Sequence, residues 1–414
     1  MNKRKEINQV FTPRKSDVNT EMYVQRPVHE KSLSRALKRD SHTLVFGESG
    51  NGKSWLYKKV LDALGIKYVV ANCANASRIG SITQEICKAI ISPGTVNKLG
   101  FSEEKAAEIN ACFAKGAAKH TGNYEIEGDE PLLRAFKIFN DIDSSKKIVV
   151  LDNLESIFSS TSLMSELADI IILLDDSRYS DCNVNILIVG IPNGVLQYFS
   201  QTKNVESVAN RILEIQKVDG LDSGQVMEVV KKGFTQLHIA ITGNTLISLA
   251  DHVHDVTLGI AQRVHEYCEA LAYEIEENNW IYDKSLLNAA DLQWLMQGLR
   301  QCYQVVESHL NSRATAVARR NQVIYCLAKI TAHQFESSDI DALIRKEFPT
   351  TVPATNMGLG SILTDLSSGD TPLIVKNDKA NTYSIKDPRY LMCIKIMLYK
   401  DSSAEQVVKK KFSR

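Results

Sequence analysis

Apolar and polar residues alternate along the first half of the chain in two different rhythms. Short runs rich in apolar and β-branched residues predict buried strands at 43–46, 66–73, 148–151 and 183–193. Between these runs, apolar residues recur every three or four positions, which predicts helices, the first of them after residue 54. Strands that alternate with helices predict an α/β fold, in which helices cover both faces of a parallel sheet.

The second half of the chain keeps the helical rhythm almost throughout. Helices are expected at 223–237, 244–255, 258–277, 315–330, 336–348 and 356–368. Two short strands around a turn at 377–381 and a helix at 388–400 follow. We therefore expect three domains, which are an α/β core at 1–217 with a turn-rich insertion at about 93–128, a helical lid at 218–310 and a winged-helix-like domain with a basic tail at 311–414.

A glycine-rich loop joins the first predicted strand to the first predicted helix. It matches the pattern G-x-x-x-x-G-K-[ST] in full, with Gly47, Glu48, Ser49, Gly50, Asn51, Gly52, Lys53 and Ser54. Because glycine lets the backbone bend sharply, successive N–H groups point inward and hold phosphate oxygens. Lys53 then reaches the β- and γ-phosphates and the Ser54 hydroxyl ligates Mg²⁺, so the loop predicts a site for ATP and Mg²⁺.

The predicted strand at 148–151 ends at Asp152, whose carboxylate is expected to face the nucleotide as the second protein ligand of Mg²⁺. The next residue is Asn153, which orients a water molecule but cannot accept its proton. Glu155 is the candidate catalytic base, and the alternative is a solvated glutamate at the start of a helix. If Glu155 is not the base, we expect slow hydrolysis and a protein that works mainly as a nucleotide-bound switch.

Charge and composition limit the class of partner and the cellular location that the sequence supports. The chain has 49 Lys and Arg against 49 Asp and Glu, which is mild evidence against a dedicated nucleic-acid binder because such proteins are usually basic. No apolar run is long enough to cross a bilayer or to serve as a secretion signal. The eight cysteines include no Cys-x-x-Cys pair, which is typical of reduced, packed thiols. We therefore expect a cytoplasmic protein.

Several motifs together resemble the origin-recognition-type AAA+ P-loop ATPases of the initiator clade, which end in a winged helix and are related to ATPases of bacterial defence and transposition systems. In chain order they are FTPRKSDVNTEMYVQRPVHEKSLSRAL, GESGNGKS, VVLDNLE, IVGIPN, NRILEI and GIAQR. The resemblance implies ATPase activity and a segment at Tyr23, Val24 and Arg26 that helps to hold adenine. It also implies that Asn193 touches the γ-phosphate or the attacking water. Trp55 directly follows the loop, and we expect it to contact the nucleotide as well.

The same resemblance gives roles to two arginines. Arg211 corresponds to the arginine finger, which reaches into a neighbouring subunit's site and so implies a homo-oligomer. The alternative is a surface arginine that pairs with Glu206 or Glu214. Arg263 corresponds to the sensor 2 arginine of the lid, which closes over the phosphates.

The predicted third helix of the winged-helix region reads NMGLGSILTDLSSGD, with two aspartates and no Lys or Arg. Because attraction to phosphate dominates DNA affinity, such a helix is poorly suited to the major groove. The sequence therefore favours a nucleotide-switched oligomeric regulator of a protein effector, with bacterial antiviral defence as its setting. A DNA-binding or DNA-loading ATPase of replication-initiator or transposition type is the alternative, supported by the basic tail and by Lys376, Lys379 and Lys386. A small-molecule kinase would leave Arg211 and Arg263 unexplained.

Overall fold

The computed structural model describes residues 4–91, 129–141, 145–190, 199, 205–311, 317–353, 357–401, 403 and 405–411. The expected insertion at 93–128 lies outside the described residues. The chain forms two compact units, each described by itself below. One unit is residues 15–219, and the other combines residues 1–14 with residues 220–414. The division of 218–414 into a lid and a winged-helix-like domain remains a prediction.

A five-stranded parallel sheet lies at the centre of the unit at 15–219, in the order β2-β3-β4-β1-β5. Its strands are β1 His42–Phe46, β2 Lys67–Asn72, β3 Lys147–Asp152, β4 Val184–Gly190 and β5 Ile212–Glu214. The first four match the predicted strands and confirm the α/β fold. The fifth strand was not among the predicted strands, because three residues carry too little pattern to be recognised.

Alternate residues of the central strands enter two separate cores, as the period of two in a strand requires. In β3, Val149 and Leu151 face one core, whereas Ile148 and Val150 face the other. This sheet is therefore buried on both faces, which explains why its strands read as continuous apolar runs.

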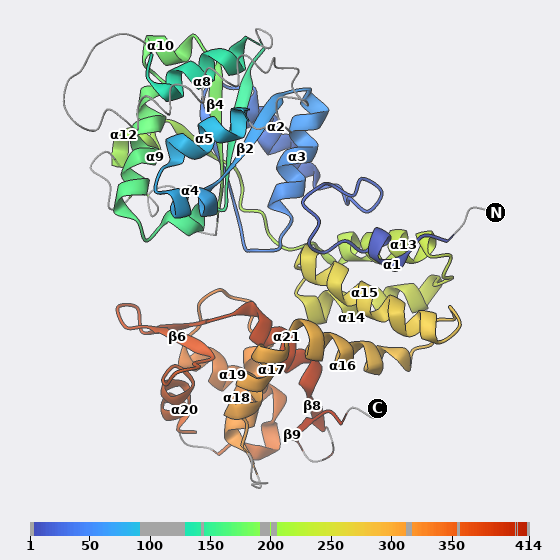
Figure 1. The fold of residues 1–414 in the computed structure, drawn as a ribbon. Helices are drawn as coiled ribbons and strands as arrows, with labels where there is room; N and C mark the ends of the chain where they lie inside the picture. Colours follow the sequence, from blue (N-terminus) through green and yellow to red (C-terminus); the bar gives the residue numbers. More distant parts are fainter. Residues whose placement is uncertain are drawn as a thin grey trace. The chain divides into compact units, whose positions relative to one another are not determined.

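Helices cover both faces of this sheet (Figure 1). On one face lie α2 Pro27–Leu37 and α3 Lys53–Leu64. The helices on the other face are α4 Cys73–Ile79, α5 Ile82–Ile91, α8 Pro131–Asn140, α9 Thr161–Leu173, α10 Ser177–Ser180 and α12 Val205–Ala209. A short 3₁₀ helix, Leu154–Ile157, follows β3.

The second unit begins with α1 Ile7–Val10 and continues after residue 220 as a series of helices. These are α13 Ser223–Gln236, α14 Gly243–Thr257, α15 Ala261–Glu277, α16 Leu286–Gly298 and α17 Arg300–His309. The N-terminal segment belongs to this unit because Phe11 is fully buried and its ring packs edge-on against Phe234, with 5.6 Å between ring centroids.

The C-terminal part has the predicted three helices, a β-hairpin and a closing helix. They are α18 Arg319–Leu327, α19 Ser337–Glu347, α20 Leu359–Leu366, β6 Ile374–Asn377, β7 Thr382–Ile385 and α21 Pro388–Met397, with a 3₁₀ turn at Pro349–Thr351. The predicted helix at 388–400 is wrong at its end, because the chain turns into β8 Leu398–Asp401. This strand pairs antiparallel with β9 Gln406–Lys409, so the basic segment before the C-terminus is anchored by a second hairpin.

Two further expectations concern the whole chain. No helix among the described residues is long and apolar enough to cross a bilayer. The seven cysteines that the structure describes are buried and form no disulfide, as their sequence context predicted.

Candidate functional site

The glycine-rich loop leaves the carboxyl end of β1 and enters α3, and its shape depends on Gly47. This residue has a φ of 153°, and a Cβ placed on it would lie 2.2 Å from the carbonyl oxygen of Val218. No side chain fits there. The segment that contains Val218 runs behind the loop, where the Val218 N–H donates to Phe46 O at 2.8 Å and Asn51 Nδ2 donates to Val218 O at 3.0 Å.

The loop ends with Gly52, a left-handed residue directly before the first turn of α3. That turn contains no acidic residue, so no carboxylate of the helix itself competes for its N–H groups and for the positive end of the helix dipole. The side-chain oxygen of Asn51 is buried and has no hydrogen-bond partner among the described residues. A glycine-rich loop that leads into the amino end of a helix, where N–H groups are free to donate, fits the phosphates of a nucleotide.

Lys53 lies across the mouth of this loop. Its Nζ donates to Gly47 O at 2.7 Å and to Glu48 O at 2.9 Å. Two carbonyl groups of the loop therefore hold the ammonium group at the place where it would bind a phosphate. Burial lowers the pKa of Lys53, while the carboxylates of Glu155, Asp152 and Glu48 act in the opposite direction. A triphosphate next to this lysine would favour its charged form in the same way.

Asp152 lies at the carboxyl end of β3, and its carboxylate meets two hydroxyl groups of α3. Ser54 Oγ donates to Asp152 Oδ2 at 3.4 Å, and Tyr57 OH donates to the same oxygen at 3.2 Å. A serine hydroxyl beside an aspartate carboxylate is a donor set suited to Mg²⁺ at a nucleotide site. The two residues predicted to hold the metal therefore lie together and fit that ion.

The backbone conformation of Asn153 and a hydrogen bond from its side-chain amide fix this residue at the edge of the sheet. It adopts a left-handed conformation with a φ of 60°, and its Nδ2 donates to Asn72 Oδ1 at 3.2 Å. Asn72 ends the neighbouring strand β2, and its N–H donates at 3.1 Å to Glu85, whose carboxylate is buried and also accepts from Asn75. The position after Asp152 therefore belongs to a polar network between β2, β3 and α5.

Glu155 lies in the 3₁₀ helix after Asn153 and is exposed. Its charge reaches the site, because it opposes the fall in the pKa of Lys53 and adds to the rise in the pKa of Cys73. Burial is the main cause that raises the pKa of Cys73 to about 12, so this thiol stays protonated and inert. Among the described residues, Glu155 is a carboxylate near Lys53 that carries no hydrogen bond to another side chain.

The segment predicted to hold adenine packs against residues 217–219, the segment that also supports the glycine loop. Tyr23, Val24 and Arg26 are buried, and Glu30 accepts from both Tyr23 OH at 2.7 Å and Arg26 N–H at 2.8 Å. Arg26 NH1 donates to Asp219 O at 2.9 Å. Residues 217–219 therefore connect the N-terminal segment with the glycine loop.

Trp55 uses its indole N–H to hold the N-terminal segment, with Nε1 donating to Lys15 O at 3.1 Å. Its side chain therefore contributes to the shape of the surrounding segment, and its expected contact with the nucleotide stays a prediction.

Arg211 lies at the other end of the sheet from the glycine loop. It directly precedes β5, and its carbonyl accepts from the N–H of His42, the first residue of β1. Its guanidinium group pairs with Asp175 at 2.5 Å and donates to Ser207 O and Oγ at 2.6 Å. Neither Glu206 nor Glu214 is its ion-pair partner, so the partner expected from sequence was wrong. Arg211 and the glycine loop of the same chain therefore lie at opposite ends of β1.

Two further residues, Asn193 and Arg263, are expected to lie near the phosphates. Asn193 lies outside the described residues. Arg263 belongs to α15 in the second unit, where it pairs with Glu266 at 2.6 Å. Their roles remain predictions.

Sequence reasoning missed three residues of the site, which are Asn72, Glu85 and Tyr57. Tyr57 could have been found, since it follows Ser54 by three positions and must share its helix face. Nothing in the sequence indicates that Asn72 faces Asn153, because that requires the register of β2 against β3. No cluster of three or more metal-ligating His, Cys, Asp or Glu side chains occurs among the residues for which the structure gives a placement.

A comparison with protein-family models matches residues 35–199 to the AAA domain. That range contains β1, the glycine loop and the strand that ends at Asp152. This part of the chain is therefore an AAA-type core. The match covers the core alone and does not extend to the second unit.

Several solved structures resemble the chain over most of its length, although no curated protein matches it. The Walker-type ATPase of Pyrococcus abyssi has 21% identity and a TM-score of 0.49, with 90% of this chain and 96% of that chain covered. The ADP form of the Aeropyrum pernix ORC2 protein has 14% identity and a TM-score of 0.48, with 94% and 97% covered. Cdc6p from Pyrobaculum aerophilum has 14% identity and a TM-score of 0.42, with 94% and 97% covered.

We expect Gly47→Ala to abolish nucleotide binding, because the added methyl group would displace the Val218 carbonyl and with it the loop. Binding of a fluorescent ATP analogue measures the effect. The matched control is Gly65→Ala at the end of the same helix, where a Cβ meets no atom within 4 Å and the φ is 66°. That change should cost only about 1 kcal/mol of unfolding free energy and leave binding intact. Full nucleotide binding by Gly47→Ala would contradict this account of the cradle.

Proposed function

We propose that the chain binds ATP with Mg²⁺, hydrolyses it slowly and acts as a nucleotide-switched regulator of a protein effector in the cytoplasm. The observation that carries the proposal is the convergence of the Gly47 cradle, Lys53, Ser54 and Asp152 within the AAA domain. Lys53 and the loop N–H groups would bind the triphosphate, and Ser54 and Asp152 would hold Mg²⁺. The metal ion would supply neutralisation of the charge that develops on the phosphates.

Slow hydrolysis is supported by the position after Asp152. Asn153 has no proton-accepting group, and its amide already donates to Asn72. Glu155 is the remaining carboxylate in this region that could take a proton from an attacking water. We therefore expect ATP to stay bound for a long time before it is hydrolysed. Such behaviour suits a protein that signals by its bound nucleotide.

We expect two substitutions at the site to separate binding from hydrolysis. Lys53→Ala should lose ATP binding, because the loop loses the ammonium group that lies against Gly47 and Glu48. Glu155→Gln should keep binding and lower the hydrolysis rate by about 10²-fold or more, the usual contribution of a general base. Equilibrium binding and single-turnover hydrolysis measure the two effects. Unchanged hydrolysis by Glu155→Gln would show that this carboxylate is solvated surface.

We further propose that the active form is a homo-oligomer in which Arg211 completes a neighbour's site. Two features support this. Arg211 lies at the amino ends of the strands, whereas its own loop lies at their carboxyl ends. Its ion pair with Asp175 is partly exposed, with 28% and 55% of the two side chains accessible, so a partner's phosphate could replace the carboxylate.

Mixing two inactive variants tests this arrangement. Arg211→Ala keeps its cradle but lacks the arginine, while Lys53→Ala keeps the arginine but lacks a working cradle. If Arg211 acts in trans, the mixture should regain part of the hydrolysis that each variant lacks, since an arginine finger contributes on the order of 10³-fold. Asp175→Ala is the control for the ion pair, and it should remain active. If Asp175→Ala loses activity as Arg211→Ala does and mixing restores nothing, Arg211 is a structural residue.

A protein effector is favoured over DNA by the surface of α20. This helix buries Leu359, Leu363 and Leu366. Its exposed positions are Gly360, Ser361, Thr364 and Asp365, and Asp365 pairs with Arg320 at 3.4 Å. These exposed positions carry no positive charge, so they lack the electrostatic attraction that dominates affinity for a phosphate backbone.

The second candidate is the DNA-binding or DNA-loading ATPase of initiator or transposition type. The β6–β7 hairpin supports it with Lys376 and Lys379, although Lys376 is paired with Asp378 at 3.4 Å. Duplex retention that falls steeply with added salt would favour this candidate, whereas no retention at low salt would favour the protein effector. Bacterial antiviral defence is the setting that we propose for the effector, and the genes that neighbour this one test it.

A further inference from the structure

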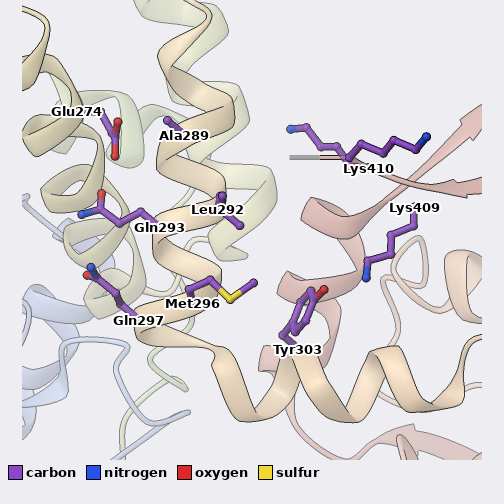
Figure 2. A pocket seen from close by; sticks show the side chains of 10 residues that line it. Glu274, Ala289, Leu292, Gln293, Met296, Gln297, Tyr303, Lys409 and Lys410 are labelled. Carbon is purple, nitrogen blue, oxygen red and sulfur yellow. The ribbon is translucent and has the colours of Figure 1, made fainter. Parts of the chain in front are cut away.

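Two cavities with basic rims lie outside the nucleotide site, and they differ in whether their charges are already used. The larger, of about 850 Å³, lies in the second unit between α16 and the end of β9 (Figure 2). Two of its three lysines have partners within the chain, since Lys409 pairs with Glu307 and Lys410 donates to the buried Asp291 at 2.8 Å, which leaves Lys411. These contacts anchor the C-terminal hairpin, so little positive charge remains there for a ligand.

The smaller cavity, of about 430 Å³, is a groove in the first unit between α2 and the edge strand β5. Three cations line it at a spacing of four residues, which places them in one row along α2 and just beyond its end. They are Lys31, Arg35 and Arg39. All three are exposed.

The charges of this row are not used within the described part of the chain. None of the three side chains has a hydrogen bond or an ion pair to another described residue. The acidic residue of the same helix, Glu30, accepts instead from Tyr23 OH and Arg26 N–H. The lining of the groove contains one carboxylate, Glu214, against three cations. The groove is therefore a basic surface on a chain whose net charge is zero.

The groove also has an apolar component. Val28 lines one end and is 61% exposed, and Leu213, Ile215 and Ala36 contribute to the walls. No aromatic residue lines it, so it has no platform on which a base could stack. Alternating cationic and apolar features match an acidic peptide with interspersed aliphatic residues better than a sugar–phosphate chain.

We propose that the α2–β5 groove is the docking site for an acidic, aliphatic segment of a protein partner. The carboxylates of that segment pair with Lys31, Arg35 and Arg39, and its aliphatic side chains cover Val28 and Leu213. This deepens the proposed function, on which it rests for the nature of the partner, by naming the chemistry that the effector presents. None of the lining residues belongs to the nucleotide site.

Binding of a short fluorescein-labelled peptide of alternating glutamate and leucine to the full chain tests the proposal. A peptide with glutamine in place of glutamate tests the charge, and one with serine in place of leucine tests the apolar component. An oligothymidylate of equal charge tests nucleic acid. We expect the glutamate–leucine peptide to bind best, and its affinity to fall with added salt.

Charge reversal on the protein locates the site. Lys31→Glu/Arg35→Glu should weaken binding of this peptide by about tenfold or more, as the loss of two exposed ion pairs implies. The matched control is Lys67→Glu/Lys88→Glu, which changes the net charge equally on exposed positions of β2 and α5, at the opposite edge of the sheet. That control should bind the peptide as the unaltered chain does.

Three results would overturn the proposal: no binding of the acidic peptide, equal weakening by both double variants, or tighter binding of the oligothymidylate through the same cations. Nucleotide binding is measured on the same samples, which shows that each variant is folded. If the unaltered chain binds nucleotide but not the peptide, the proposal for the groove is wrong and the proposed ATPase function stands. A chain that binds the peptide but no nucleotide loses the proposed ATPase function and keeps the groove.

Discussion

The phosphate loop of this protein is held from behind by one extended segment, residues 217–219. Val218 contacts the loop on two sides, through its N–H to Phe46 and through its carbonyl to Asn51, and it approaches Gly47 too closely for any side chain. The neighbouring carbonyls of Lys217 and Asp219 accept from His29 and Arg26. The loop and the segment proposed to hold adenine are thus fixed to the same three residues, directly before the chain enters the second unit.

Asp152 and Asn153, which follow one another at the end of β3, have different surroundings. Asp152 keeps the environment that a metal ligand needs, with hydroxyl groups of α3 beside it. Asn153 instead belongs to a network with Asn72 and the buried Glu85, which joins the ends of β2 and β3 to α5. A carboxylate at position 153 would carry no N–H to donate to Asn72. The asparagine therefore stabilises the edge of the sheet directly after the expected metal ligand.

Local pattern predicted the features whose cause is local. Apolar runs gave the first four strands, and the glycine spacing gave the loop with Lys53 and Ser54 next to Asp152. What could not be predicted depends on contacts between distant residues. The three residues of β5 form a strand because β1 offers a free edge, and Leu398–Asp401 leaves the helical pattern because β9 pairs with it. The partner of Arg211 proved to be Asp175, which is distant in sequence, rather than either neighbouring glutamate.

The division of the chain into two units has a consequence for how it folds. Phe11 is buried against Phe234 and close to His265, so a segment that is synthesised before the unit at 15–219 is packed by helices that are synthesised after it. During synthesis this segment, with the apolar side chain of Phe11, stays unpacked while the unit at 15–219 is made. Completion of the helical unit is thus a late step of biogenesis, and an incomplete chain would expose Phe11 to the chaperones that recognise apolar segments.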